Sequence, residues 1–81
     1  MWQQTKDGLY KKFEFADFAQ AFEFMTRVAA IAEGVTHHPR WTNEYGTVEI
    51  WLRTHSAGDT VTDKDKDLAT AIGRVASEYI A

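Results

Sequence analysis

The sequence predicts an α+β fold, a two-layer sandwich in which a four-stranded antiparallel sheet carries two helices on one face. Two stretches, residues 2–15 and residues 40–55, alternate apolar and polar side chains about a turn signal. Each stretch is followed by apolar residues at helical spacing, so the expected element order is β-β-α-β-β-α. The 81 residues, of which 44% are hydrophobic, favour a single globular domain over residues 1–81.

The first predicted unit is a hairpin followed by a helix that ends near Gly34. Asp7-Gly8 is a turn dipeptide between the two strands. One face of the second strand is expected to be buried through Leu9, Phe13 and Phe15. Asp17 followed by Gln20 resembles a capping box at the start of the helix. The apolar stripe expected on this helix comprises Phe18, Ala21, Phe22, Met25, Val28, Ala29 and Ala32.

The second unit repeats this arrangement. Gly46 is expected to close a hairpin whose last strand has an inner face of Val48, Ile50 and Leu52. The opposite face of that strand is expected to stay open and to carry Glu49, Trp51, Arg53 and His55. Thr62 followed by Asp65 marks the start of a second helix that reaches the C-terminus. Its apolar stripe comprises Leu68, Ala71, Ile72, Val75 and Tyr79.

The amino-acid composition excludes or disfavours several classes of function. The chain has no cysteine, which excludes disulfides, thiolate catalysis and cysteine-based zinc sites. The net charge of −3 disfavours direct nucleic-acid binding, which normally requires clustered Lys and Arg. Residues 1–6 hold no signal-like apolar run, and no stretch is long and apolar enough to span a membrane. We expect a cytoplasmic, soluble protein that gains stability through oligomerisation, since so small a domain buries only a modest part of its surface.

All three histidines of the chain fall between residues 37 and 55. His37-His38-Pro39 follows the first predicted helix, and Pro39 favours an extended backbone at His38. If Gly46 closes the hairpin, His55 returns to the same end of the sheet. Histidine has an unperturbed pKa of about 6.5, so a cluster of histidines suits proton transfer with a bound organic molecule. Each histidine taken alone would be an ordinary loop or strand-end residue, but the clustering favours a site.

A metal site is the next alternative, because three imidazoles leave an open catalytic position on zinc. Metal ligands prefer helical i, i+4 spacing or alternation along a strand. The adjacent pair His37 and His38 does not easily direct both rings to one ion. We therefore favour acid-base chemistry and predict no metal.

The chain resembles the pterin-4a-carbinolamine dehydratase family, also known as dimerisation cofactors of a homeodomain transcription factor. The resemblance covers nearly the whole chain, and its most specific part is a Glu-x-x-x-His-His-Pro-x-Trp core. The matching motifs are Phe13-x-Phe15-x-Asp17-Phe18, Ala21-Phe22, Glu33-x-x-x-His37-His38-Pro39-x-Trp41-x-Asn43-x-Tyr45, Val48-x-Ile50-x-Leu52-x-Thr54-His55 and Thr62-x-x-Asp65-x-x-Leu68-Ala69.

The resemblance implies a lyase that removes water from a 4a-hydroxytetrahydropterin to give the quinonoid dihydropterin. In tetrahydrobiopterin recycling this step regenerates the cofactor of aromatic amino-acid hydroxylases, which are the implied pathway partners. No metal or cofactor is required, because the pterin is the substrate. The resemblance also implies a homodimer paired through sheet edges, and often a homotetramer paired through helices.

The resemblance further implies the site. His37 and His55 are expected to transfer protons, with acid and base unassigned, and His38 to bind and orient the pterin. Glu33 is expected to orient His37, or else to be a solvated residue at the end of a helix. Trp41 is expected to stack on the pterin, or else to be a core aromatic. The remaining predicted substrate contacts are Pro39, Thr54 and Ser56.

One departure from the family pattern affects the charge of the pocket, because Arg40 stands where the family commonly carries an acidic residue. Two other functions stay open from the sequence. One is a non-catalytic protein-binding module of the transcriptional-coactivator type, and the other is a protein that binds a pterin, or a related molybdopterin precursor, without turning it over.

Overall fold

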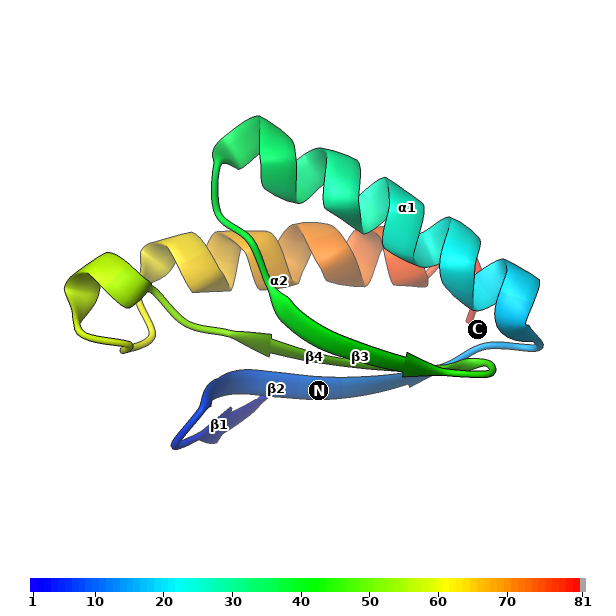
Figure 1. The fold of residues 1–81 in the computed structure, drawn as a ribbon, viewed down its shortest axis with the longest axis horizontal. Coiled ribbons are helices and arrows are strands. Elements are labelled where there is room, and N and C mark those ends of the chain that lie inside the picture. Colours follow the sequence, from blue (N-terminus) through cyan, green and yellow to red (C-terminus); the bar gives the residue numbers. More distant parts are fainter. Residues whose placement is uncertain (81) are drawn as a thin grey trace.

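The computed structural model describes residues 1–80, and its elements follow the predicted order (Figure 1). This order, together with the single antiparallel sheet, confirms the predicted fold class. The elements are β1 Gln3–Thr5, β2 Gly8–Glu14, α1 Phe18–Val35, β3 Arg40–Glu44, β4 Thr47–Leu52, a 3₁₀ turn at His55–Ala57, and α2 Asp63–Ala76. Among these residues, no helix is both long and apolar enough to cross a lipid bilayer.

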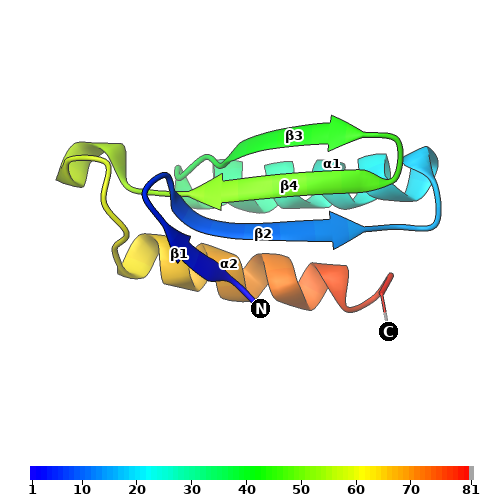
Figure 2. The ribbon, with the colours of Figure 1, turned by 90° about the horizontal axis from the view of Figure 1, so that it is seen from below.

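The strands lie in the order β1-β2-β4-β3, and every neighbouring pair is antiparallel. Figure 2 shows β4 between β2 and β3, with both helices behind the sheet. Because β1 pairs only with Gly8–Tyr10, the outer edge of β2 from Lys11 to Glu14 lacks a neighbouring strand within residues 1–80. The sheet therefore has one face covered by helices, one open face and a partly uncovered edge.

The core lies between the sheet and the two helices, in agreement with the predicted inner face of β4. Alternation along β4 buries Val48, Ile50 and Leu52. Phe13 of β2 is also buried, whereas Leu9 and Phe15 are partly buried and pack against the core. The helices contribute Ala21, Phe24, Val28, Ala32, Leu68, Ala69, Ile72, Val75 and Ala76.

The buried stripe of α1 differs from the prediction. Phe24 is fully buried and packs 4.7 Å from the Phe15 ring, between ring centroids. Phe18 and Phe22, which were expected in the core, are 54% and 55% exposed and stack on each other 5.8 Å apart. Ala29 is exposed as well. The helix is apolar around most of its circumference, and the sheet covers only the side that carries Phe24.

Two predicted ends were also wrong. The last strand ends at Leu52, so His55 lies in the 3₁₀ turn rather than on the open face of a strand. The second helix ends at Ala76 instead of continuing through Tyr79.

The predicted turn at Asp7-Gly8 is present, and β2 begins at Gly8 with a φ of +112°. A Cβ atom at Gly8 would lie 2.2 Å from the carbonyl oxygen of Leu52, so only glycine fits there.

Candidate active site

The end of α1 separates the two adjacent histidines. Thr36 caps the helix in the left-handed conformation, with φ 52°, and its N–H donates to the Glu33 carbonyl. The N–H of His37 donates to the Ala32 carbonyl at 3.0 Å. As a result the two rings lie in different surroundings: the side chain of His37 is 12% exposed, and that of His38 is 61% exposed.

His37 is held by a buried carboxylate. Its Nε2 lies 2.6 Å from Oδ1 of Asp65, whose side chain is completely buried in the first turn of α2. The other carboxylate oxygen, Oδ2, accepts from the Thr54 hydroxyl at 2.8 Å and from the Thr62 backbone N–H at 2.9 Å. The same carboxylate therefore takes part in the predicted capping box of α2 and fixes a histidine of the candidate site.

Competing influences act on the pKa of Asp65. Burial is the largest single influence and raises the pKa, but hydrogen bonds from His37, the Thr62 N–H and the Thr54 hydroxyl together outweigh it. The pKa of Asp65 therefore lies below its usual value, and the group is a carboxylate at neutral pH. Because a carboxylate only accepts hydrogen bonds, Nε2 of His37 carries a proton. Nδ1 is then the nitrogen that is left for chemistry.

Glu33 contacts His38 rather than His37, contrary to the predicted pairing. Its Oε1 lies 2.8 Å from Nε2 of His38, and both side chains are mostly exposed. The backbone explains the difference, because the left-handed Thr36 reverses the chain and brings His38 back over the last turn of α1.

His55 has an acidic partner in its own loop. Its Nδ1 lies 2.8 Å from Oδ1 of Asp59, and its side chain is 96% exposed. The hydrogen bond from His55 is the main cause that lowers the pKa of Asp59, and the charge of Arg53, whose Nε lies 3.9 Å from Oδ1, adds to the effect. The loop is closed by the N–H of Thr54, which donates to the Thr60 carbonyl. Since Asp59 is ionised, Nδ1 of His55 carries a proton and Nε2 is left for chemistry.

All three histidines line one open cavity of about 340 Å³. This volume lies at the lower end of the range for small-molecule sites. The other residues that line this cavity are Thr36, Arg53, Thr54, Ser56 and Lys64. A second cavity of about 230 Å³ adjoins it and is lined by His38, Pro39, Arg40, Trp51, Arg53, His55 and Asp59. The predicted convergence of the histidines at one end of the sheet is thus present in the structure.

The residues predicted to contact the substrate do not all line the cavities with free polar groups. Ser56 lines the first cavity and Pro39 the second. Thr54 lines the first cavity but is buried, and its hydroxyl, N–H and carbonyl are all bonded within the protein. Trp41 lies on the helix-facing side of β3 and packs against the core, which favours its reading as a core aromatic.

Asp65 is a site residue that the sequence reasoning missed. The sequence identified it only as a helix-capping residue, three positions after Thr62. A signal was present, because an aspartate at this position of a helix has one carboxylate oxygen to spare after capping. Only the fold brings that oxygen to a histidine 28 residues away.

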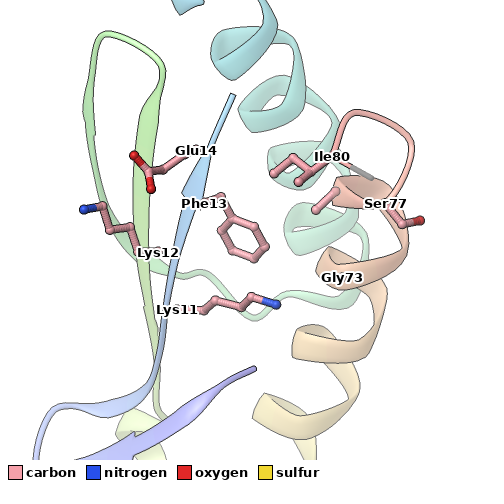
Figure 3. A pocket seen from close by; sticks show the side chains of 8 residues that line it. Lys11, Lys12, Phe13, Glu14, Gly73, Ser77 and Ile80 are labelled. Atoms are coloured by element: carbon pink, nitrogen blue, oxygen red, sulfur yellow. The ribbon is translucent and has the colours of Figure 1, made fainter. Parts of the chain in front are cut away.

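A larger cavity lies elsewhere, between the uncovered edge of β2 and the end of α2 (Figure 3). It measures about 520 Å³, and Figure 3 shows Phe13 facing Gly73 and Ile80 across it. No histidine lines it. The acid-base groups therefore mark the smaller cavity as the candidate active site.

Comparison with known proteins identifies the family. The profile described as "Pterin 4 alpha carbinolamine dehydratase" matches residues 1–75. This chain belongs to that family.

Among similar proteins of the dehydratase family, one from Rhodopseudomonas palustris strain HaA2 is 48% identical over 80 residues, covering 96% of this chain and 78% of its own. Another, from Bradyrhizobium diazoefficiens, is 51% identical over 71 residues, covering 88% of this chain and 70% of its own. Both carry the name "Putative pterin-4-alpha-carbinolamine dehydratase".

Two solved structures share the fold. A crystal structure titled transcriptional coactivator/pterin dehydratase, from Brucella melitensis, has a TM-score of 0.87 at 38% identity, covering 93% of this chain and 81% of that chain. A pterin dehydratase-like protein, described as a RuBisCO assembly factor in the alpha-carboxysome, has a TM-score of 0.75. At 23% identity, with 94% and 87% of the two chains covered, this second likeness concerns the fold alone.

Proposed function

We propose that the chain is a 4a-hydroxytetrahydropterin dehydratase, a carbon-oxygen hydro-lyase that works by histidine acid-base catalysis. The observation that carries this proposal is the single cavity lined by His37, His38 and His55. Membership of the family supports a pterin as the bound molecule. The product would be the quinonoid dihydropterin, and the step would serve tetrahydrobiopterin recycling for aromatic amino-acid hydroxylases without a metal or cofactor.

The reaction needs one acid and one base. The bond from C4a to the hydroxyl oxygen breaks, and the oxygen leaves as water after it accepts a proton. The proton on N5 departs, and its bonding electrons form the new double bond between N5 and C4a. One proton is given and one is taken in each turnover, so two histidines with different protonation states suffice.

His37 suits the role of the base. The carboxylate of Asp65 holds the proton on Nε2, which leaves the lone pair of Nδ1 to accept the proton from N5. The imidazolium that forms is then stabilised by a buried negative charge at 2.6 Å. The arrangement follows the logic of histidine-aspartate pairs in hydrolases, where the aspartate fixes the tautomer and offsets the charge that develops.

His55 suits the role of the acid. Its ring is almost fully exposed, so it exchanges protons rapidly with water, and its contact with Asp59 through Nδ1 directs Nε2 to the substrate. A proton on Nε2 would pass to the departing hydroxyl. His38, anchored by Glu33, would bind and orient the pterin, and Ser56 and Pro39 would contact it. Thr54 would act through Asp65 rather than by touching the substrate.

The test is an assay of carbinolamine dehydration by variants. Removal of either proton-transfer group is expected to lower kcat by about 10²–10⁴-fold. His55→Gln is the more informative single variant, because the ring is 96% exposed and its removal leaves no cavity in the core. Arg74→Gln, an exposed change on α2, is the control. A His37→Ala and His55→Ala double variant that keeps the wild-type rate would show that the mechanism is wrong.

The pH profile separates the two roles. We expect a bell-shaped dependence of kcat/KM on pH, whose acidic limb reports protonation of the base and whose alkaline limb reports deprotonation of the acid. His55→Gln should flatten the alkaline limb, and His37→Gln the acidic limb. If the two variants lose the opposite limbs, the acid and base roles are exchanged.

The exposed stack of Phe18 and Phe22 favours a second property, self-association. Two aromatic rings that are both more than half exposed on one helix face form an apolar patch of the kind that mediates protein contact. The uncovered edge of β2 offers a second surface. These features support a homodimer or homotetramer, and they also favour the alternative of a non-catalytic binding module of the coactivator type.

A further inference from the structure

The two cavities concentrate positive charge within an acidic chain. They are lined by three side chains with fixed positive charge, Arg40, Arg53 and Lys64, and by one carboxylate, Asp59. In the chain as a whole, nine Lys and Arg face twelve Asp and Glu. Protonated histidines add to the positive charge at the site. A cleft with this balance attracts an anion in preference to a neutral molecule.

Arg40 is held in place on the open face of the sheet. Its Cζ lies 4.7 Å from the centroid of the Trp51 ring, and the two residues are direct cross-strand partners. From the neighbouring strand, the ring of Tyr10 packs against Trp51 at 5.2 Å, and its hydroxyl donates to Glu49. A guanidinium stacked on an aromatic ring keeps the N–H groups at its edge for a planar anion. Arg40 is therefore positioned before any ligand binds.

Arg53 lines the same cavity as Arg40. It lies directly after the end of β4 at Leu52, and its side chain is 40% exposed. Asp59 offsets only part of its charge, because the closest approach is 3.9 Å and Asp59 also binds His55. Two guanidinium groups on one small cavity match the oxygens of a phosphate or a carboxylate.

The position of this cavity fits one part of a pterin. In a 6-substituted pterin, the side chain is attached to C6, the atom next to N5. The two cavities share three lining residues, His38, Arg53 and His55. A ring whose N5 and C4a lie among the histidines would therefore extend its side chain into the cavity that Arg40 and Arg53 line.

We propose that the substrate is a pterin whose C6 side chain carries a negative charge, bound by Arg40 and Arg53. This inference rests on the proposed dehydratase function and names the substrate class within it. The charged group is a phosphate ester or a carboxylate, which share the geometry that two guanidinium groups recognise.

The experiment compares matched pairs of stable pterins in a binding titration with the full chain. One pair is 6-(trihydroxypropyl)pterin with and without a terminal phosphate, and the other is 6-hydroxymethylpterin against pterin-6-carboxylate. The anionic member of at least one pair is expected to bind about tenfold more tightly at low salt. The preference should shrink as ionic strength rises, since both arginines are exposed to solvent. The pair that shows the preference identifies phosphate or carboxylate.

Variants assign the preference to the two arginines. Arg53→Gln should reduce it several-fold, and Arg40→Glu should abolish or reverse it. Arg74→Gln removes one positive charge from a distant part of α2 and should leave it unchanged. Equal binding within both pairs, or a preference that survives Arg40→Glu, would overturn the inference.

Turnover of a neutral pterin separates this inference from the function on which it rests. If the chain dehydrates a neutral 4a-hydroxytetrahydropterin as well as a charged one, the dehydratase stands and the side-chain preference is refuted. If no pterin of either kind is bound or dehydrated, both proposals fail.

Discussion

The Nε2 atom of His37 and the Oδ1 atom of Asp65 lie 2.6 Å apart, although the two residues are separated by 28 positions in the chain. The contact joins the end of α1 to the start of α2. The hydroxyl of Thr54 supports this contact by donating a hydrogen bond to the second oxygen, Oδ2, of the same carboxylate. The candidate site therefore depends on the packing of the two helices and of the segment that follows β4, and the first predictions concern this carboxylate.

Asp65→Asn is expected to destabilise the fold by about 1–3 kcal/mol, because an amide cannot accept from His37, Thr54 and the Thr62 N–H as the carboxylate does. Asp63 provides a matched control in the same turn of α2, since it is exposed. Asp63→Asn should cost only about 0.3–1 kcal/mol through the helix dipole. Urea unfolding measures the free energy of unfolding of both variants. Equal losses of stability in the two variants would contradict the structural role of Asp65.

Stability should depend on pH through the same group. The pKa of Asp65 is lower in the folded chain than its ordinary value of about 3.9, so its contribution is complete above that value and is lost as pH falls through the folded-state pKa. Urea midpoints measured from about pH 7 down to about pH 2 should therefore fall for the wild type. Asp65→Asn should flatten part of this fall, and Asp63→Asn should retain it.

The two tryptophans of neighbouring strands should respond differently to substitution. Trp41 packs against the core, so Trp41→Ala should cost about 3 kcal/mol of stability and leave kcat/KM of the folded protein nearly unchanged. Trp51 lies under Arg40 on the open face, so Trp51→Ala should cost about 1 kcal/mol but weaken binding of an anionic pterin. Urea unfolding and a pterin titration on each variant measure these effects. A large rise in KM for Trp41→Ala would restore its predicted stacking role.

Self-association should depend on the outer face of α1. Phe22→Glu places a charge in the exposed aromatic stack and should raise the dissociation constant of the oligomer by about tenfold or more. Lys6→Glu is the control, because Lys6 is exposed in the turn between β1 and β2, at the opposite end of the sheet from the start of α1 (Figure 1). Analytical ultracentrifugation at several protein concentrations measures the dissociation constant of both variants. If Phe22→Glu associates like the wild type, this face is not the interface.

The periodicity of the sequence was sufficient for the element order but not for the orientation of α1. Phe18, Phe22 and Phe24 all fit a helical pattern, because apolar residues cover most of the helix surface. The side that faces the sheet depends on how the chain enters the helix after β2, where Phe15 packs against Phe24. That contact is tertiary, and no spacing rule contains it.

The candidate site was predictable in its histidines and not in their partners. The hairpin geometry correctly brought His55 towards His37 and His38. Glu33 was paired with His37 because helical spacing assumes that the helix continues, whereas the left-handed Thr36 interrupts it. Asp59 and Asp65 could not be assigned as partners, since their positions depend on the loop after β4 and on the docking of α2.

The double use of Asp65 links the proposed dehydratase activity to the integrity of a single helical turn. Fraying of the first turn of α2 would release the imidazole of His37 while the rest of the sheet and α1 remain assembled. Heat should therefore inactivate the protein at a lower temperature than the one at which its near-ultraviolet aromatic signal is lost.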